Sequence, residues 1–179
     1  MGRIKELKPF AKTFFILIAV FFVSMTLVYC IPTSWIQGNV EKSLEVMEGE
    51  GEYPMYFFYR HSAIIDVHTD KLIQNRDYYN PIQAAMSINQ YPRYWHGYQV
   101  LLRPLTVIFQ VQELRYLGML TFHLLFFWSA WLMAKKTKPL YAMLYVLTVA
   151  SGYIVFLPVC FQFLTTFLVL FVSLIVLLS

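Results

Sequence analysis

Residues 13–31 read TFFILIAVFFVSMTLVYCI and contain no charged side chain. A helix of about 19 such residues is long enough to cross the hydrocarbon core of a bilayer. The run is longer than the apolar region of a cleaved signal peptide, and the bulky Tyr29 precedes Cys30 where a processing site favours a small residue. The sequence therefore predicts an uncleaved first membrane-spanning helix.

The composition of the whole chain agrees with a membrane protein. Of its 179 residues, 59% are hydrophobic and only 13% are charged, which is too apolar for a soluble domain of this length. The apolar residues come in long runs without alternation, so a membrane β-barrel is not expected. The net charge is +4, but the cations lie beside the apolar runs and form no basic face, so nucleic acid is not an expected partner.

Three further apolar runs follow the first one, at residues 114–134, 140–159 and 161–178. Together the four runs predict an all-α integral membrane protein with about four transmembrane helices. The chain stops at Ser179 directly after the last run, with no polar flank. We therefore expect these helices to be part of a larger multi-span fold; the alternative is that the last two runs form a tightly turned helical hairpin.

Basic residues predict the orientation. Residues 1–12 carry four basic residues and one acid, and residues 135–139 contain three lysines. Short cytoplasmic segments carry an excess of Lys and Arg, and two crossings separate these two segments, so both are expected in the cytoplasm. Residues 33–113 then form one large exoplasmic loop of a protein in the plasma membrane of a bacterium.

The loop has its own pattern. An amphipathic helix is expected over residues 36–47, before a Gly-Glu-Gly break at 49–51. A second helical stretch at 62–75 is expected to end before a turn at Asn80-Pro81. Residues 91–111 are aromatic and basic but too short in their apolar part to span, so they are expected to lie along the membrane interface or dip in shallowly.

Asp66 and Asp70 are the candidate catalytic residues, because their four-residue spacing places both on one face of a helix. Their like charges repel, which makes one carboxylate a stronger base and suits it to accept a proton near neutral pH. Two close acids also suit a divalent cation, but His61 and His68 match no established zinc spacing, so no metal site is assigned. The alternative is a solvated acidic face of a loop helix.

Arg93, His96 and Arg103 are the candidate ligands of a lipid phosphate. A guanidinium can hold a phosphate or diphosphate through two parallel hydrogen bonds. The alternative is that these residues only anchor the protein's own surface among lipid head groups, where cationic and aromatic residues gather for mechanical reasons. His123 is the remaining candidate, because it is ionisable and lies inside an apolar run; its alternative is a neutral imidazole bonded to a neighbouring helix.

Two motifs carry a resemblance to a known family. Residues 80–86 read NPIQAAM and residues 91–98 read YPRYWHGY, and with the first span they resemble the N-terminal part of a family of uncharacterised multi-span membrane proteins. These proteins are encoded by Gram-positive bacteria near genes for cell-surface polysaccharide. The likeness covers most of residues 9–119, and residues 91–104 are its most specific part.

The layout of that family is similar to that of the GT-C-type glycosyltransferases, whose first outer loop supplies an essential carboxylate and whose donor is a polyprenyl-phosphate sugar. The resemblance implies that Asp66 or Asp70 takes the proton from the hydroxyl of a glycan acceptor. It also implies that Arg93, His96 or Arg103 neutralises the phosphate of the leaving lipid.

Three functions remain open at this point. The first is a lipid-linked sugar transferase of cell-envelope polysaccharide assembly. The second is a non-catalytic scaffold or assembly subunit whose outer loop binds a partner, and the third is part of a transporter or flippase. Membrane lipids are expected partners in all three.

Overall fold

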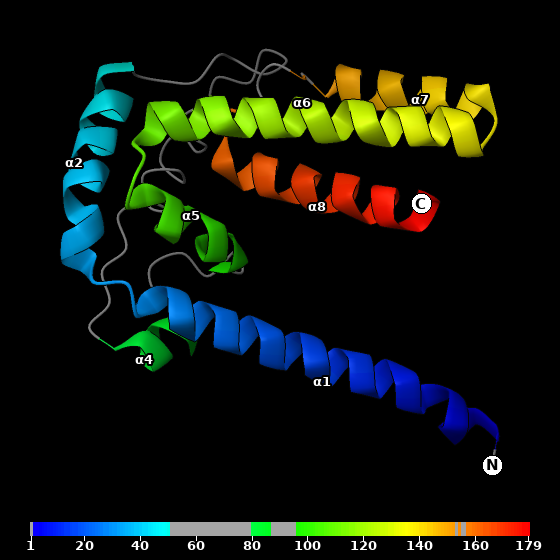
Figure 1. Cartoon of the computed structure of the whole chain (residues 1–179), viewed down its shortest axis with the longest axis horizontal. Helices are drawn as coiled ribbons and strands as arrows, with labels where there is room; N and C mark the ends of the chain where they lie inside the picture. The colour runs from blue at the N-terminus through cyan, green and yellow to red at the C-terminus, as the bar shows by residue number, and fades with distance from the viewer. Residues whose placement is uncertain (1, 51–79, 87–95, 153, 155–156) are drawn as a thin grey trace. The chain divides into compact units, whose positions relative to one another are not determined.

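The computed structural model describes residues 2–50, 80–86, 96–152, 154 and 157–179. Within these ranges every regular element is a helix, which confirms the predicted all-α class (Figure 1). The elements in chain order are α1 (Gly2–Tyr29), α2 (Thr33–Glu50), α4 (Pro81–Met86), the 3-10 helix η1 (His96–Tyr98), α5 (Gln99–Thr106), α6 (Val111–Lys136), α7 (Pro139–Ser151) and α8 (Phe161–Leu178).

The chain forms two compact units. The first contains residues 1–38 and 76–108, and the second contains residues 39–75 and 109–179. The first unit therefore holds α1, the first residues of α2, α4, η1 and α5. The second holds the rest of α2 together with α6, α7 and α8.

In the first unit, α4 and α5 pack against α1. The core of this unit consists of Met25 and Tyr29 of α1 and Ala84 of α4, with Phe21 and Val100 packed against them. Apolar contacts between the last turns of α1 and the later segment thus hold the unit together.

Two dipeptides that contain proline, Ile31-Pro32 and Asn80-Pro81, determine where α1 ends and where α4 begins. α1 ends at Tyr29, three residues before Pro32, because proline cannot continue the backbone hydrogen-bond pattern and restricts the residue before it. The side-chain oxygen of Asn80 accepts hydrogen bonds from the N–H groups of Ile82 (3.0 Å) and Gln83 (3.3 Å). Asn80-Pro81 was expected to form a turn after a helix; it instead begins α4, with asparagine as N-cap and proline in the first helical position.

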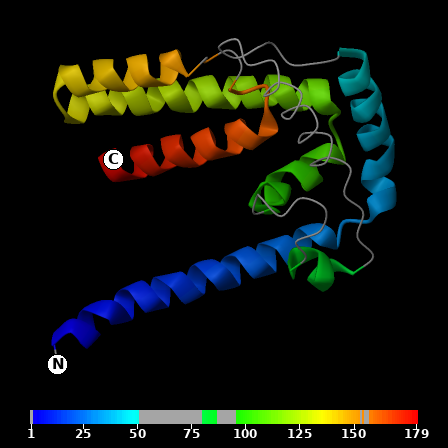
Figure 2. The same cartoon turned by 180° about the vertical axis from the view of Figure 1, so that it is seen from behind.

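In the second unit, α7 and α8 both pack along α6 (Figures 1 and 2). α6 begins after Gln110, whose backbone N–H donates a 2.8 Å hydrogen bond to the carboxylate of Glu113. It ends in two lysines, which favour the negative end of the helix dipole, and Pro139 opens α7 after a short turn.

An aromatic cluster fills the space between α6, α7 and α8. Phe122 and Phe171 are fully buried with ring centroids 5.1 Å apart, and Phe126 lies 5.7 Å from Tyr145. The Ser129 hydroxyl donates to the carbonyl of Phe126 (2.8 Å) and lies 2.7 Å from the Tyr145 hydroxyl. Because the single Ser129 hydrogen is used in the first bond, the Tyr145 hydroxyl is the donor in the second.

The helix lengths separate the four expected spans into two groups. Phe10–Tyr29 in α1 and Val111–Lys136 in α6 are long and apolar enough to cross a membrane. The third span was expected over residues 140–159, but α7 has 13 residues and ends at Ser151, which gives about 20 Å of helix against a hydrocarbon core of about 30 Å. α8, with 18 residues, lies close to the required length.

The close packing around Gly118 in α6 predicts how an added methyl group changes the stability of the protein. A Cβ on Gly118 would lie 2.7 Å from Cδ2 of Leu164 and 3.3 Å from the carbonyl oxygen of Pro158, whereas Gly38 has nothing within 4 Å. Overpacking in Gly118→Ala should cost about 1–3 kcal/mol of unfolding free energy, from which the better helix preference of alanine subtracts up to about 1 kcal/mol, so the variant should be less stable. Gly38→Ala should leave the free energy of unfolding unchanged or raise it by up to about 1 kcal/mol. Thermal unfolding in detergent micelles measures both, and equal stability of the two variants would contradict the close contact.

The Tyr145 hydroxyl provides a second prediction. Tyr145→Phe removes the bond to Ser129, and interhelical hydrogen bonds of this kind contribute about 0.6 kcal/mol on average in membrane proteins. Tyr141→Phe is the matched control, because Tyr141 lies in the same helix and is 53% exposed. We expect only Tyr145→Phe to lower the midpoint of thermal unfolding; a loss of equal size in the control would remove the role of the bond.

Candidate functional site

Of the five predicted site residues, only Arg103 has side-chain contacts within the part of the chain that the structure describes. Asp66, Asp70 and Arg93 lie outside the described residues, and for His96 the structure gives the backbone at the start of η1. The roles predicted for Asp66, Asp70, Arg93 and His96 stay predictions.

Arg103 projects from α5 onto the end of α1. It is 3% exposed, and its Nη2 donates hydrogen bonds to the carbonyl oxygen of Ile31 (2.9 Å) and the hydroxyl of Thr33 (3.2 Å). The guanidinium carbon lies 5.1 Å from the centre of the Tyr29 ring, within the range of a cation–π contact. All of these residues belong to the first unit.

The physical role of this contact follows from the backbone of α1. The last carbonyl groups of a helix have no partner within it, and they form the negative end of the helix dipole. A buried cation that donates to Ile31 satisfies one of the carbonyls just beyond the helix end and is stabilised by the dipole. Arg103 thus connects α5 to the end of α1, and phosphate binding by the same guanidinium stays a prediction.

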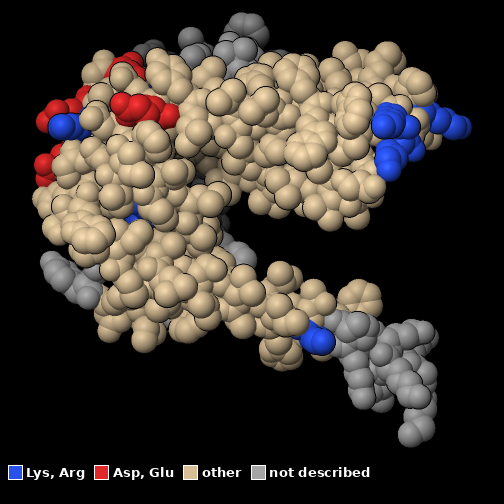
Figure 3. Space-filling model, in the orientation of Figure 1, with Lys and Arg blue, Asp and Glu red and all other residues tan. Residues whose placement is uncertain are grey.

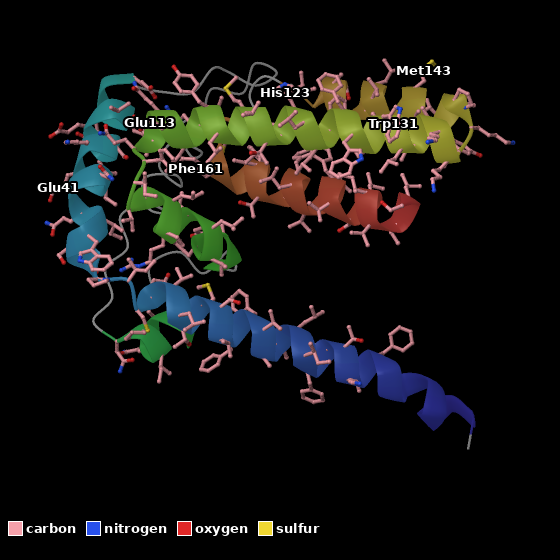
Figure 4. All side chains as sticks on the ribbon, viewed as in Figure 1. Glu41, Glu113, His123, Trp131, Met143 and Phe161 are labelled. Atoms are coloured by element: carbon pink, nitrogen blue, oxygen red, sulfur yellow. The ribbon has the colours of Figure 1, made fainter. Side chains whose placement is uncertain are left out.

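The two ends of α6 differ in net charge: five glutamates with Lys42 and Arg115 lie at its start, and three lysines lie at its end. Acidic residues gather over α2 and the start of α6, and lysines gather over the turn between α6 and α7 (Figure 3). Figure 4 shows Glu41 and Glu113 at the first end and Trp131 near the second. The acids are Glu41, Glu45, Glu48, Glu50 and Glu113, and the lysines are Lys135, Lys136 and Lys138.

Contacts within the second unit fix the acidic end. Arg115, which is 8% exposed, forms an ion pair with Glu50 at the end of α2. The Ser43 hydroxyl is fully buried, donates to the carbonyl of Asn39 (2.6 Å) and accepts from the N–H of Val111 (2.9 Å). The second bond satisfies one of the four N–H groups that the start of α6 leaves without an intrahelical acceptor.

His123 lies in the uncharged part of α6. Its Nδ1 is 2.7 Å from the carbonyl oxygen of Met119 in the same helix, so Nδ1 carries a proton in this arrangement. The ring also meets the edge of Phe122, with centroids 5.4 Å apart. The hydrogen bond of Nδ1 is thus made within α6 and not, as the alternative had it, to a neighbouring helix.

The described residues set limits on metal chemistry. Within those ranges, no three or more His, Cys, Asp or Glu residues form a group that could hold a metal ion. The described part also holds two buried guanidinium groups, Arg103 at the end of α1 and Arg115 at the start of α6, which donate to oxygen atoms of the protein.

Sequence reasoning missed the contacts of Ser43 and the Glu50–Arg115 pair. One signal for Ser43 was available, because Ile36, Val40, Ser43 and Met47 follow helical spacing and all are buried. A small polar residue in that apolar stripe indicates a hydrogen bond to another element. Glu50 and Arg115 are 65 positions apart, and no local pattern links them.

No family model, curated protein or solved structure matches this chain.

The junction of α2 and α6 predicts different effects for two serines. Ser43→Ala leaves the buried N–H of Val111 without its acceptor, which should cost about 1–3 kcal/mol of unfolding free energy. Ser151→Ala is the matched control, because its hydroxyl is exposed and donates only to Thr148 in its own helix. Unfolding monitored by circular dichroism in detergent measures both, and an unchanged midpoint for Ser43→Ala would contradict the proposed capping of α6.

Proposed function

We propose that the chain is an integral membrane protein of bacterial cell-envelope polysaccharide assembly that uses a polyprenyl-phosphate-linked sugar. The observation that carries the membrane part is the charge pattern of α6. Between Arg115 and Lys135 there are 19 residues without an Asp, Glu, Lys or Arg, which correspond to about 28 Å of helix. That length matches the hydrocarbon core, and the charged ends match the two interfaces.

The surfaces of α1 and α6 support this placement. The side chains of Phe15 and Leu17 in α1 and Phe127 in α6 are each more than 60% exposed. Large exposed apolar surfaces of this kind are typical of contacts with lipid or with other proteins. Lys135 lies 5.0 Å from the ring centre of Trp131, a pairing expected where a helix leaves the hydrocarbon region.

The hydroxyl groups on exposed helix faces support it as well. Thr121 donates to the carbonyl of Leu117, and Thr148 donates to that of Leu144, both at 2.8 Å. Hydroxyls that face water need no such bond, whereas hydroxyls that face lipid find acceptors only within the protein. These bonds satisfy both hydroxyls within their own helix, as a lipid-facing position requires.

The resemblance of residues 80–104 to proteins of surface-polysaccharide loci supports the finer proposal. In the proposed reaction, Asp66 or Asp70 accepts the proton of the acceptor hydroxyl as its oxygen attacks the anomeric carbon of the sugar. The bond from that carbon to the phosphate oxygen breaks, and the lipid phosphate leaves with the electron pair. Arg93, His96 or Arg103 stabilises the negative charge that develops on the phosphate.

A non-catalytic membrane subunit is the second candidate. The observation that favours it is the commitment of Arg103 to Ile31 and Thr33, which gives one of the predicted phosphate ligands a structural task. In that case the exoplasmic segment binds a partner protein, and its acids serve solubility.

Cysteine labelling tests the orientation. In a background with Cys30→Ser and Cys160→Ala, we expect Glu41→Cys to react with a membrane-impermeant maleimide in intact cells. Lys138→Cys should react only after the cells are opened, because the positive-inside bias places it in the cytoplasm. Reaction of Lys138→Cys in intact cells would reverse the orientation.

A transfer assay tests the chemistry. The full-length protein in membranes is supplied with polyprenyl-phosphate sugars, and Asp66→Asn and Asp70→Asn are compared with the parent. Loss of a general base should lower turnover by about 100-fold or more in one of the two variants. Unchanged turnover in both would end the catalytic proposal for these acids, and a parent without transfer to any donor would favour the subunit.

A further inference from the structure

α5 buries polar side chains and exposes an apolar one, whereas a helix in water does the opposite. Gln99, Arg103 and Thr106 are 4%, 3% and 3% exposed, whereas Leu101 is 60% exposed. Ile108, just beyond the helix, is 70% exposed. α5 thus buries these three polar residues together with Leu102, which is 9% exposed, while Leu101 is its exposed side chain. Buried polar and exposed apolar side chains are the arrangement expected for a helix surrounded by hydrocarbon.

The contacts of this segment fix its level along α1. A Cβ on Gly97 would lie 3.2 Å from Cε2 of Phe21. Val100 packs against the core of Met25 and Tyr29, and Arg103 reaches Ile31. The segment from η1 to α5 thus runs beside the last part of α1, from Phe21 to the helix end.

These contacts give the depth at which η1 and α5 would lie in a bilayer that α1 crosses. The apolar stretch of α1 extends over Phe10–Tyr29, so Phe21 lies near its middle. From Phe21 to Tyr29 the helix rises about 12 Å, which is close to half of a hydrocarbon core of about 30 Å. If α1 crosses the bilayer, Gly97 lies near the bilayer centre and Arg103 lies near the interface.

We propose that η1 and the first part of α5 are embedded in the bilayer beside the second half of α1, with lipid acyl chains against Leu101. This inference rests on the proposed membrane placement of α1. It goes beyond an interfacial position, because the embedded segment reaches the level of Phe21. The ligand of this surface is therefore the hydrocarbon of one leaflet.

The backbone of the segment fits this environment. In hydrocarbon, N–H and C=O groups have to be satisfied within the protein. The N–H of Val107 donates to the carbonyl of Pro104 (3.3 Å), and the N–H of Ile108 donates to that of Leu105 (3.0 Å). The hydroxyl of Thr106 donates to the carbonyl of Leu102 (2.8 Å). The end of α5 is thus closed by its own hydrogen bonds.

Acyl chains are the favoured occupant because the exposed apolar side chains of α5 continue the apolar surface of the helix on which α5 packs. Phe14, Phe15 and Leu17 of α1 are all more than half exposed. A protein partner on α5 would need to displace lipid from a surface that shares its chemistry with a spanning helix. Water on the same surface would leave Leu101 hydrated while Gln99 and Arg103 were buried.

The test uses the full-length chain in vesicles of phosphatidylcholine and phosphatidylglycerol, with Cys30→Ser and Cys160→Ala as background. A nitroxide is attached to Leu101→Cys. Leu17→Cys is the control in hydrocarbon, and Glu41→Cys is the control in water. Spin relaxation is measured with molecular oxygen, which concentrates in hydrocarbon, and with a water-soluble nickel chelate.

We expect the label at 101 to match Leu17→Cys, with strong relaxation by oxygen and loss of the relaxation by nickel that Glu41→Cys shows. Nickel relaxation equal to that of Glu41→Cys would place α5 in water and overturn the proposal. Protection from both reagents would show a protein cover and would also overturn it. If Leu17→Cys itself is open to nickel, the membrane placement of α1 fails together with the proposal.

Discussion

The need to satisfy polar groups within the chain governs the described part of this protein. Its helices expose apolar side chains and turn hydroxyl, imidazole and guanidinium groups toward carbonyl or carboxylate oxygens of the protein. Thr121, Thr148 and His123 bond to their own helices, whereas Ser43 and Arg103 bond to other elements. The same constraint explains why α5 buries its polar residues. It also explains why the first N–H group of α6 donates to the hydroxyl of Ser43 in α2.

The sequence predicted the helical class and the two long apolar helices because those features depend on composition and run length alone. The uncharged run at 13–31 and the lysines after Ala134 are local signals, and α1 and α6 follow them closely. The third span was predicted over residues 140–159, whereas the structure ends α7 at Ser151. Apolar residues continue past Ser151, but Gly152 has a low preference for helix, and its N–H bonds to Val149 in a tighter turn.

The candidate site was less predictable, because its contacts join distant parts of the chain. Arg103 could be selected from the sequence as a cation near an interface, but its partners, Ile31 and Thr33, are more than 65 positions away. The Glu50–Arg115 pair has the same character. Charge and periodicity identify residue types and faces, whereas the choice of partner depends on packing between elements that no local pattern encodes.

The bond between Arg103 and Ile31 also has a consequence for biosynthesis. Its two ends are 72 residues apart in the chain, and a ribosome adding about 5–20 residues per second needs roughly 4–14 s to make that length. Throughout this interval the cation that caps the end of α1 has not been made. The carbonyl group of Ile31 therefore has to wait for its Arg103 donor, and α1 is synthesised well before the contact that fixes α5 to its end can form.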